Sequence, residues 1–178
     1  MTPTFADTFR MRTRLQLDHW RSTQRRDAEG FVESEERIRL AKPVVAQSED
    51  GARYLGEGYW LAVARASRGL VRRRDRGSAV ELRFLRWGPC LLRFAAPTTT
   101  IDDSCVACRY GILGGMLTRS AGGALTLTQI ERPDPELTAA VSGFAPRLGR
   151  PLYEQLQRRL HLAVSRRYFT ALVTEAQP

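Results

Sequence analysis

Apolar and polar side chains alternate along two stretches near the N-terminus. In residues 10–19 one face carries methionine, threonine, leucine and histidine, while arginine, glutamine and aspartate occupy the alternate positions. A period of two is typical of a strand with one buried face. We expect strands at 10–19 and from Glu36 to Pro43, the second continuing through Val44 and Val45. A polar loop at 22–30 should separate them.

The spacing of apolar residues changes between positions 48 and 71. From Leu55 to Leu70 they recur every three or four residues, which predicts an amphipathic helix. Ser48, followed by two acidic residues, is a favourable start for that helix. The same stretch contains three glycines: Gly56, Gly58 and Gly69. Each glycine costs a helix about 1 kcal/mol, so a strand remains the alternative here.

Alternation returns after a turn at Arg76–Gly77 and continues in short segments separated by turn sequences. The expected strands are 80–84, 90–94, 101–112, 116–119, 125–130 and 137–144. Gly114 and Gly115 indicate a bulge or bend between two of them. Short consecutive strands joined by tight turns predict an antiparallel meander.

The longest helical pattern runs from Pro151 to about Val173. At about 100° per residue its apolar side chains form one broad stripe. The stripe comprises Leu152, Tyr153, Leu156, Leu160, Ala163, Val164 and Ala171. Arg167 projects near the centre of this stripe, where an isolated buried charge would be very costly. Two interpretations stay open: Arg167 meets a structural carboxylate or solvent, or it faces a cavity and binds an anionic ligand group.

These elements together predict an α+β protein, a curved antiparallel sheet packed against a long C-terminal helix. A length of 178 residues and a hydrophobic content of 43% fit a single core. No apolar run approaches the roughly 20 residues of a membrane-spanning helix, and we see no secretory signal. The odd cysteine count, with Cys90, Cys105 and Cys108, favours a reducing compartment. We therefore expect a cytoplasmic protein.

The chain is strongly basic, with a formal net charge of +9. Such a charge attracts nucleic acid and anionic membrane surfaces. However, Lys42 is the one lysine among 28 basic residues, and the arginines are spread along the chain. The longest uninterrupted basic block is Arg72–Arg74. A composition bias explains this distribution as well as phosphate recognition does, so we do not favour nucleic acid as the partner.

The residues with reactive side chains form no recognisable catalytic or metal-binding motif. Cys105 and Cys108 are spaced as C-x-x-C but lack a second ligand pair, and their spacing in a strand points the thiols to opposite faces. No acidic residue lies three or four positions from His161, and a lone histidine such as His19 on the apolar face of a strand is usually a core residue. Glycine motifs for nucleotides are absent. We expect no catalytic residue, no metal and no cofactor.

The order of elements resembles the helix-grip fold of the START-like (SRPBCC) superfamily, and within it a bacterial domain family of unknown function. The resemblance covers residues 36–173 and rests on Cys108–Gly115, the strand pair ending at Gly143-Phe144, and 151–169. It implies a helix-grip-like domain at 36–178. Residues 1–35 lie outside the resemblance and form an N-terminal extension that carries the extra strand expected at 10–19. The resemblance also implies a hydrophobic pocket between sheet and C-terminal helix, which members often use for lipids, sterols or aromatic polyketides.

The function expected from this resemblance is binding of a hydrophobic or amphipathic small molecule, apolar or aromatic, without catalysis. One alternative is a cyclase- or hydratase-like enzyme that uses the same pocket. Another, of a different class, is an arginine-rich module for nucleic acid or an acidic partner. The residues expected to bind the ligand are Trp60, Arg109, Tyr110, Leu160, Val164, Arg167 and Tyr168.

Overall fold

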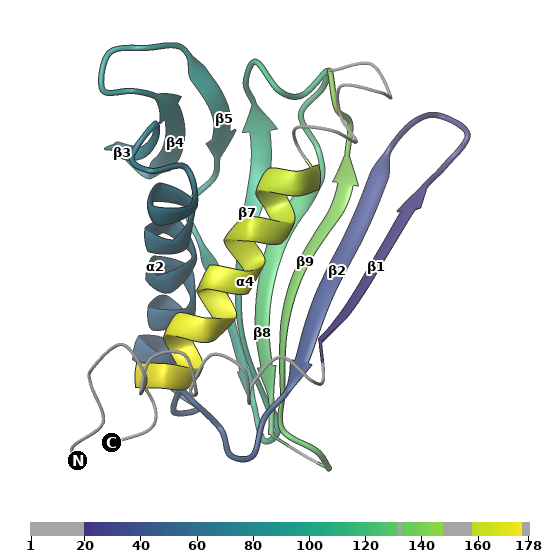
Figure 1. Cartoon of the computed structure of the whole chain (residues 1–178), viewed down its shortest axis with the longest axis vertical. Coiled ribbons are helices and arrows are strands. Elements are labelled where there is room, and N and C mark those ends of the chain that lie inside the picture. The colour runs from purple at the N-terminus through teal and green to yellow at the C-terminus, as the bar shows by residue number, and fades with distance from the viewer. Residues whose placement is uncertain (1–19, 132, 148–157, 176–178) are drawn as a thin grey trace, which may run out of the picture.

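One antiparallel sheet with two helices across one face forms the framework of the protein (Figure 1). The computed structural model describes residues 20–131, 133–147 and 158–175. The strands are β1 (Arg21–Arg26), β2 (Val32–Arg39), β3 (Val71–Arg76), β4 (Ala79–Phe84), β5 (Cys90–Phe94), β6 (Thr98–Asp102), β7 (Cys105–Gly114), β8 (Ala124–Ile130) and β9 (Glu136–Phe144). The helices are α2 (Glu49–Ala66) and α4 (Arg158–Glu175). The α+β class, with a curved sheet and a C-terminal helix packed on it, is confirmed.

The strand order across the sheet is β1-β2-β9-β8-β7-β5-β4-β3, and β6 pairs with β7 off this path. All of the pairings are antiparallel. Hairpins therefore account for most connections, as expected for a meander, whereas β2 and β9 are brought together from distant parts of the chain. The boundary at residue 35 that separates the expected extension from the domain falls inside β2.

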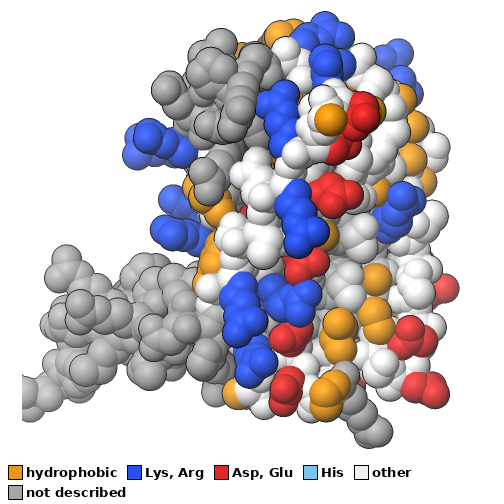
Figure 2. Space-filling view, turned by 90° about the vertical axis from the view of Figure 1, so that its right-hand side faces the viewer, with side chains coloured by type: hydrophobic (Ala, Val, Ile, Leu, Met, Phe, Trp, Pro, Cys, Tyr) orange, Lys and Arg blue, Asp and Glu red, His pale blue; other side chains and the backbone are white. Residues whose placement is uncertain are grey.

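The prediction of a polar loop at 22–30 is wrong, because most of it forms the edge strand β1 and its hairpin to β2. β1 is exposed almost throughout, so it carries no alternating signal. Figure 2 faces this edge and shows basic and acidic side chains interspersed, which discourages pairing with another sheet. The strand expected at 10–19 lies outside the described residues.

The second strand begins at Val32 and not at Glu36, and it ends at Arg39. Its expected continuation through Val44 and Val45 does not form. Instead the buried side chain of Gln129 accepts hydrogen bonds from the amides of Val44 (2.8 Å) and Val45 (3.0 Å) and donates to the Val45 carbonyl at 2.8 Å. The Gln129 side chain therefore makes the hydrogen bonds that a neighbouring strand would make, and it holds Val44 and Val45 against β8.

The helix expected from residue 48 is confirmed as α2. The Ser48 hydroxyl caps it by accepting a hydrogen bond from the Gly51 amide at 3.1 Å. The helix ends at Ala66, and Arg68 and Gly69 adopt positive φ angles of 52° and 78°. The helix therefore ends before Leu70, where we expected its apolar pattern to end, and the chain turns into β3, a strand that we did not expect.

The predicted strands at 80–84, 90–94, 125–130 and 137–144 are confirmed as β4, β5, β8 and β9. The single strand expected at 101–112 is instead two, β6 and β7, separated by a tight turn. In that turn the Asp102 carboxylate accepts a hydrogen bond from the Ser104 amide at 3.0 Å. The strand expected at 116–119 is reduced to one bridge between Thr118 and Pro146.

The described part of the C-terminal helix, α4, begins at Arg158, and the start expected at Pro151 lies outside the described residues. The buried face of α4 consists of Val164, Ser165, Tyr168, Phe169 and Leu172. Arg167 is exposed, so its predicted place at the centre of the apolar stripe is wrong. The projection gave too much weight to the leucines preceding residue 161 and too little to the aromatic pair at 168 and 169.

Both helices pack on the same face of the sheet and diverge toward the end where α4 begins (Figure 1). At their close end Gly58 of α2 lies against the Tyr168 ring, where an added Cβ would be 3.4 Å away. Phe169 packs edge-on against Trp20, with ring centroids 5.5 Å apart. Among the described residues no helix is both long and apolar enough to cross a membrane.

Candidate functional site

A cavity of about 130 Å³ lies where α2 and α4 diverge above the sheet. We call it the helix–sheet cavity. Its lining residues from the two helices are Tyr59, Trp60, Val63, Leu160, His161 and Val164. The sheet and its loops contribute Ser34, Val71, Leu82, Leu91, Leu92, Phe94, Ile112, Leu117, Leu125, Val141 and Phe144. Nearly all of these side chains are apolar, so the cavity favours an apolar occupant.

The polar corner of the helix–sheet cavity is formed by Ser34 and His161. The His161 Nε2 atom lies 2.8 Å from a carboxylate oxygen of Glu36 and 3.2 Å from the Ser34 hydroxyl. Glu36 is 1% exposed, and its other oxygen accepts a hydrogen bond from Ser22 at 3.4 Å. A buried carboxylate needs such partners. His161 thereby connects the start of α4 to β2.

The geometry assigns roles to these groups. Because Nε2 is close to a carboxylate, which only accepts hydrogen bonds, Nε2 carries the proton and donates it to Glu36. The Ser34 hydroxyl has no other partner among the described residues, so its own proton is free to be donated toward the cavity. This arrangement differs from a catalytic triad, in which the two histidine nitrogens contact serine and carboxylate separately. It does not activate Ser34 as a nucleophile.

A group of buried aromatic rings lies beside the helix–sheet cavity and beneath α2. Trp60 packs against Tyr110 and Phe94, with ring centroids 4.9 and 5.2 Å apart, and Tyr59 packs against Tyr168 at 5.5 Å. Burial raises the pKa of all three tyrosines, and the charge of Glu36 raises the pKa of Tyr59 further. The Tyr168 hydroxyl has no hydrogen-bond partner among the described residues. This cluster is a rigid wall and does not offer a reactive group.

The seven residues expected to bind a ligand divide into three groups. Trp60, Leu160 and Val164 line the helix–sheet cavity. Tyr110 and Tyr168 are buried in the aromatic cluster and do not line the helix–sheet cavity. Arg109 and Arg167 are both exposed and do not line it. Neither arginine therefore polarises the cavity.

Ser34, Glu36 and His161 were missed as site residues, although the sequence contained a signal for one of them. Glu36 shares the inner face of β2 with Val32 and Ile38, and it is the charged residue in that alternating set. A carboxylate on a buried face needs a partner. That partner, His161, is 125 positions away in the sequence, so spacing along the helix alone could not identify it.

Replacing His161 by alanine is expected to destabilise the protein by about 2 kcal/mol, because the buried Glu36 carboxylate loses its 2.8 Å partner. Urea unfolding measures this change. The double variant Glu36→Gln/His161→Ala should recover part of the loss, since it leaves no buried charge, and Glu33→Gln on the exposed face of β2 is the control. Equal stability of His161→Ala and the unchanged protein would contradict this assignment.

The cysteines form no site among the described residues. Cys108 is fully buried on the inner face of β7, whereas Cys105 is half-buried on the other face, as the strand geometry predicted. Burial raises the pKa of both thiols, which lowers their reactivity. Within 20–131, 133–147 and 158–175 no three histidine, cysteine, aspartate or glutamate side chains are grouped so that they could hold a metal ion.

Comparison with known proteins gives no family for this chain. No protein-family model matches it, and no curated protein matches it. A conserved protein of unknown function from Enterococcus faecalis is similar in structure, with 11% identity, a TM-score of 0.45, and coverage of 90% of this chain and 81% of that one. A protein from Mycobacterium smegmatis has 13% identity and a TM-score of 0.38, with 87% and 98% covered. A protein from Arthrobacter aurescens has 11% identity and a TM-score of 0.43, with 86% and 91% covered.

Proposed function

We propose that this protein binds a small neutral molecule, about the size of one aromatic ring, in the helix–sheet cavity. The observation that carries the proposal is a mostly apolar cavity with one polar corner, made by Ser34 and His161. Apolar walls with a few placed polar groups are typical of small-molecule sites. The curved sheet gripping a C-terminal helix also supports membership of the START-like superfamily, and three free cysteines fit a cytoplasmic location.

The volume of the cavity limits the size of the ligand. At about 130 Å³, it is close to the roughly 150 Å³ of an engineered apolar cavity in another protein that binds benzene. Sites for larger ligands usually measure about 300–1,000 Å³. Lipids, sterols and polyketides, which the START-like resemblance implies, are therefore too large for the cavity with these side-chain positions.

The charges around the cavity limit the chemistry of the ligand. Glu36 places a buried negative charge behind the polar corner, and Arg109 and Arg167 lie elsewhere. A ligand carboxylate would be repelled there without a cation to pair with. The free proton of Ser34 instead suits a hydroxyl or carbonyl oxygen. We favour a phenol, aromatic alcohol, aldehyde or small ketone over the carboxylate ligands that Arg167 first suggested.

The proposal is tested with a panel of one-ring probes. Phenol, p-cresol and benzaldehyde should bind with dissociation constants of about 1 mM or tighter and raise the melting temperature, whereas benzoate should not. Calorimetry and ligand-observed NMR measure the binding. If none of the neutral probes binds, or if benzoate binds equally well, the proposal is wrong.

Filling the cavity is expected to abolish binding of these probes. Ile112 points into the cavity from β7, and its neighbour Leu113 is 48% exposed on the opposite face. Ile112→Trp should therefore lose binding at least tenfold, while Leu113→Trp retains it. Val164→Phe fills the same space from α4 and serves as a second variant. Retained binding in folded Ile112→Trp and Val164→Phe would place the probes elsewhere.

A second candidate function, a cyclase- or hydratase-like enzyme in the same cavity, is favoured by one observation. His161 borders the cavity, and because its Nε2 proton is donated to Glu36, the other ring nitrogen is the one that could act as a base toward a ligand. Such a group should catalyse exchange of the α-protons of a bound ketone such as acetophenone for deuterium in D₂O, followed by NMR. Exchange that is no faster than in buffer, or that is unchanged in His161→Gln, would exclude this activity for ketones.

A further inference from the structure

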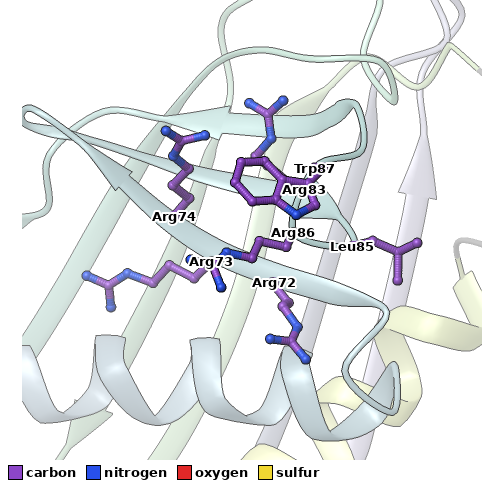
Figure 3. Close-up of a pocket in the computed structure, with 7 residues that line it drawn as sticks. All are labelled: Arg72, Arg73, Arg74, Arg83, Leu85, Arg86 and Trp87. Atoms are coloured by element: carbon purple, nitrogen blue, oxygen red, sulfur yellow. The ribbon is translucent and has the colours of Figure 1, made fainter.

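A second cavity, of about 370 Å³, lies at the β3–β4 hairpin (Figure 3). We call it the arginine pocket. It is lined by Arg72, Arg73, Arg74, Arg83, Leu85, Arg86 and Trp87. Arg72 and Arg83 occupy directly opposite positions where β3 pairs with β4. Because side chains alternate along a strand, both lie on the face opposite to Val71 and Leu82, which line the helix–sheet cavity. Arg73 lies by the same alternation on the face of Val71 and Leu82, but the two cavities share no lining residue.

The five guanidinium groups of the arginine pocket are only partly neutralised. Arg73 forms ion pairs with Glu57 and Asp75, and Arg83 pairs with Glu81 at 3.0 Å. Among the described residues Arg72, Arg74 and Arg86 pair with no carboxylate. Arg72 donates to the Gly69 carbonyl at 3.2 Å, and Arg86 stacks on the Trp87 ring at 5.2 Å. The pocket thus keeps about three positive charges that the described part of the chain does not balance.

Trp87 is 81% exposed, the highest exposure among the large hydrophobic side chains of the described residues. The loop that presents it is held in place. The Leu85 amide donates to the Leu70 carbonyl at 2.6 Å, and the Arg83 Nε donates to the Gly88 carbonyl at 3.1 Å. Leu85 adopts a φ of 56°, a conformation that non-glycine residues rarely take. These contacts fix the backbone on both sides of Trp87, so the loop presents its indole to solvent at a defined place beside the arginines.

We infer that the arginine pocket binds single-stranded nucleic acid, with phosphates held by Arg72, Arg74 and Arg86 and a base stacked on Trp87. Guanidinium groups bind phosphate through two parallel hydrogen bonds. Alternating cations and exposed aromatic rings are the usual means of binding single strands without sequence preference. The volume of the pocket suits about one nucleotide. The net charge of +9 adds long-range attraction for a polyanion.

The same features disfavour other anionic partners. A duplex keeps its base faces covered, so it could use the arginines but not the indole. An acidic peptide also needs only the arginines. A flat anionic bilayer could take up Trp87 but could not fill a concave pocket. A single strand alone uses phosphate sites, stacking surface and concavity together.

The test measures fluorescence anisotropy of a labelled oligothymidylate of about twelve nucleotides. Arg72→Gln/Arg74→Gln should weaken binding about 10- to 100-fold, and Trp87→Ala about tenfold. Arg21→Gln/Arg25→Gln on the exposed strand β1 removes the same charge and is the matched control, expected to change affinity less than threefold. In the unaltered protein, binding should quench tryptophan fluorescence, and Trp87→Ala should lose that quenching. Melting curves check that all variants fold.

Four results would overturn the inference. If Arg72→Gln/Arg74→Gln and Arg21→Gln/Arg25→Gln lost the same affinity, net charge alone would explain the binding. Equal affinity for duplex would show that binding does not require an unpaired base to stack on Trp87. Equal affinity for thymidine monophosphate would indicate that the ligand is a free nucleotide. Trp87-dependent flotation with phosphatidylserine vesicles, without oligonucleotide binding, would indicate a membrane surface.

Discussion

Raising the pH from about 10 to about 12 is expected to remove several kcal/mol from the free energy of unfolding. Three buried tyrosines, Tyr59, Tyr110 and Tyr168, cause this loss. Burial raises the pKa of each phenol above its usual value of 10. Total stabilities are typically about 5–15 kcal/mol, so a loss of several kcal/mol is a large fraction of the stability of the protein.

The sign follows from proton binding in the two states. Above pH 10 the unfolded chain releases its phenolic protons, whereas the folded protein keeps them because the pKa of each buried phenol is raised. The folded state then binds more protons, so its stability falls as the pH rises. Below pH 10 both states keep these protons and the effect is absent. The slope is up to about 4 kcal/mol per pH unit for three tyrosines.

Tyrosinate absorbance and circular dichroism measure this transition on the same sample. The absorbance change from the three buried phenols should coincide with the loss of circular dichroism, because these phenols ionise only when the fold opens. Tyr59→Phe should reduce the slope by about one third, because it removes one of the three buried phenols. Ionisation of all tyrosines near pH 10 with unchanged circular dichroism would contradict the burial of this cluster.

Local sequence patterns predicted the elements that bury one face. The helix α2 and the strands β4, β5, β8 and β9 were identified because each has a period that separates an apolar from a polar side. The edge strand β1 was missed because both of its faces are exposed. The turn between β6 and β7 was missed because Asp102, Asp103 and Ser104 form it without glycine or proline. The periodicity of apolar residues shows which side chains are buried. It does not reveal a turn that is formed by side-chain hydrogen bonds.

The candidate site was predicted less completely than the fold, because its polar corner depends on contacts between distant residues. The resemblance to the START-like superfamily implied a pocket between sheet and C-terminal helix, and Trp60, Leu160 and Val164 line the helix–sheet cavity, although their role in binding a ligand stays a prediction. The pairing of Glu36 with His161 requires knowing which turn of α4 lies over β2. A rotation error of one residue on α4 was enough to place Arg167 at the site in place of His161.

Gly56→Ala and Gly58→Ala, two identical substitutions in α2, are expected to differ in stability by about 3 kcal/mol. A Cβ added at Gly56 would lie 2.2 Å from the Tyr110 hydroxyl oxygen and 3.2 Å from the Cys108 sulfur. Both neighbours are buried on β7 and have little room to move. A Cβ added at Gly58 meets the nearest side-chain atoms at an ordinary 3.4 Å. Both variants gain about 1 kcal/mol in helix propensity, so this gain cancels in the comparison.

Urea unfolding of both variants measures the difference, and a third variant tests its cause. Tyr110→Phe removes the hydroxyl that an added Cβ would strike. Gly56→Ala should therefore cost about 1–2 kcal/mol less in the Tyr110→Phe background than in the unchanged protein. Equal stability of Gly56→Ala and Gly58→Ala would show that α2 does not approach β7 as closely as the structure indicates.

The close approach of α2 to β7 at Gly56 also affects the proposed ligand site, because Trp60 and Val63 follow on the same helix and line the helix–sheet cavity. If Gly56→Ala relieves the overlap by lifting α2, those two side chains move away from the sheet and the cavity widens. Probe binding should then change in Gly56→Ala but not in Gly58→Ala. Rescue of both stability and probe affinity by Tyr110→Phe would connect this one helix–sheet contact to the size of the ligand that the cavity accepts.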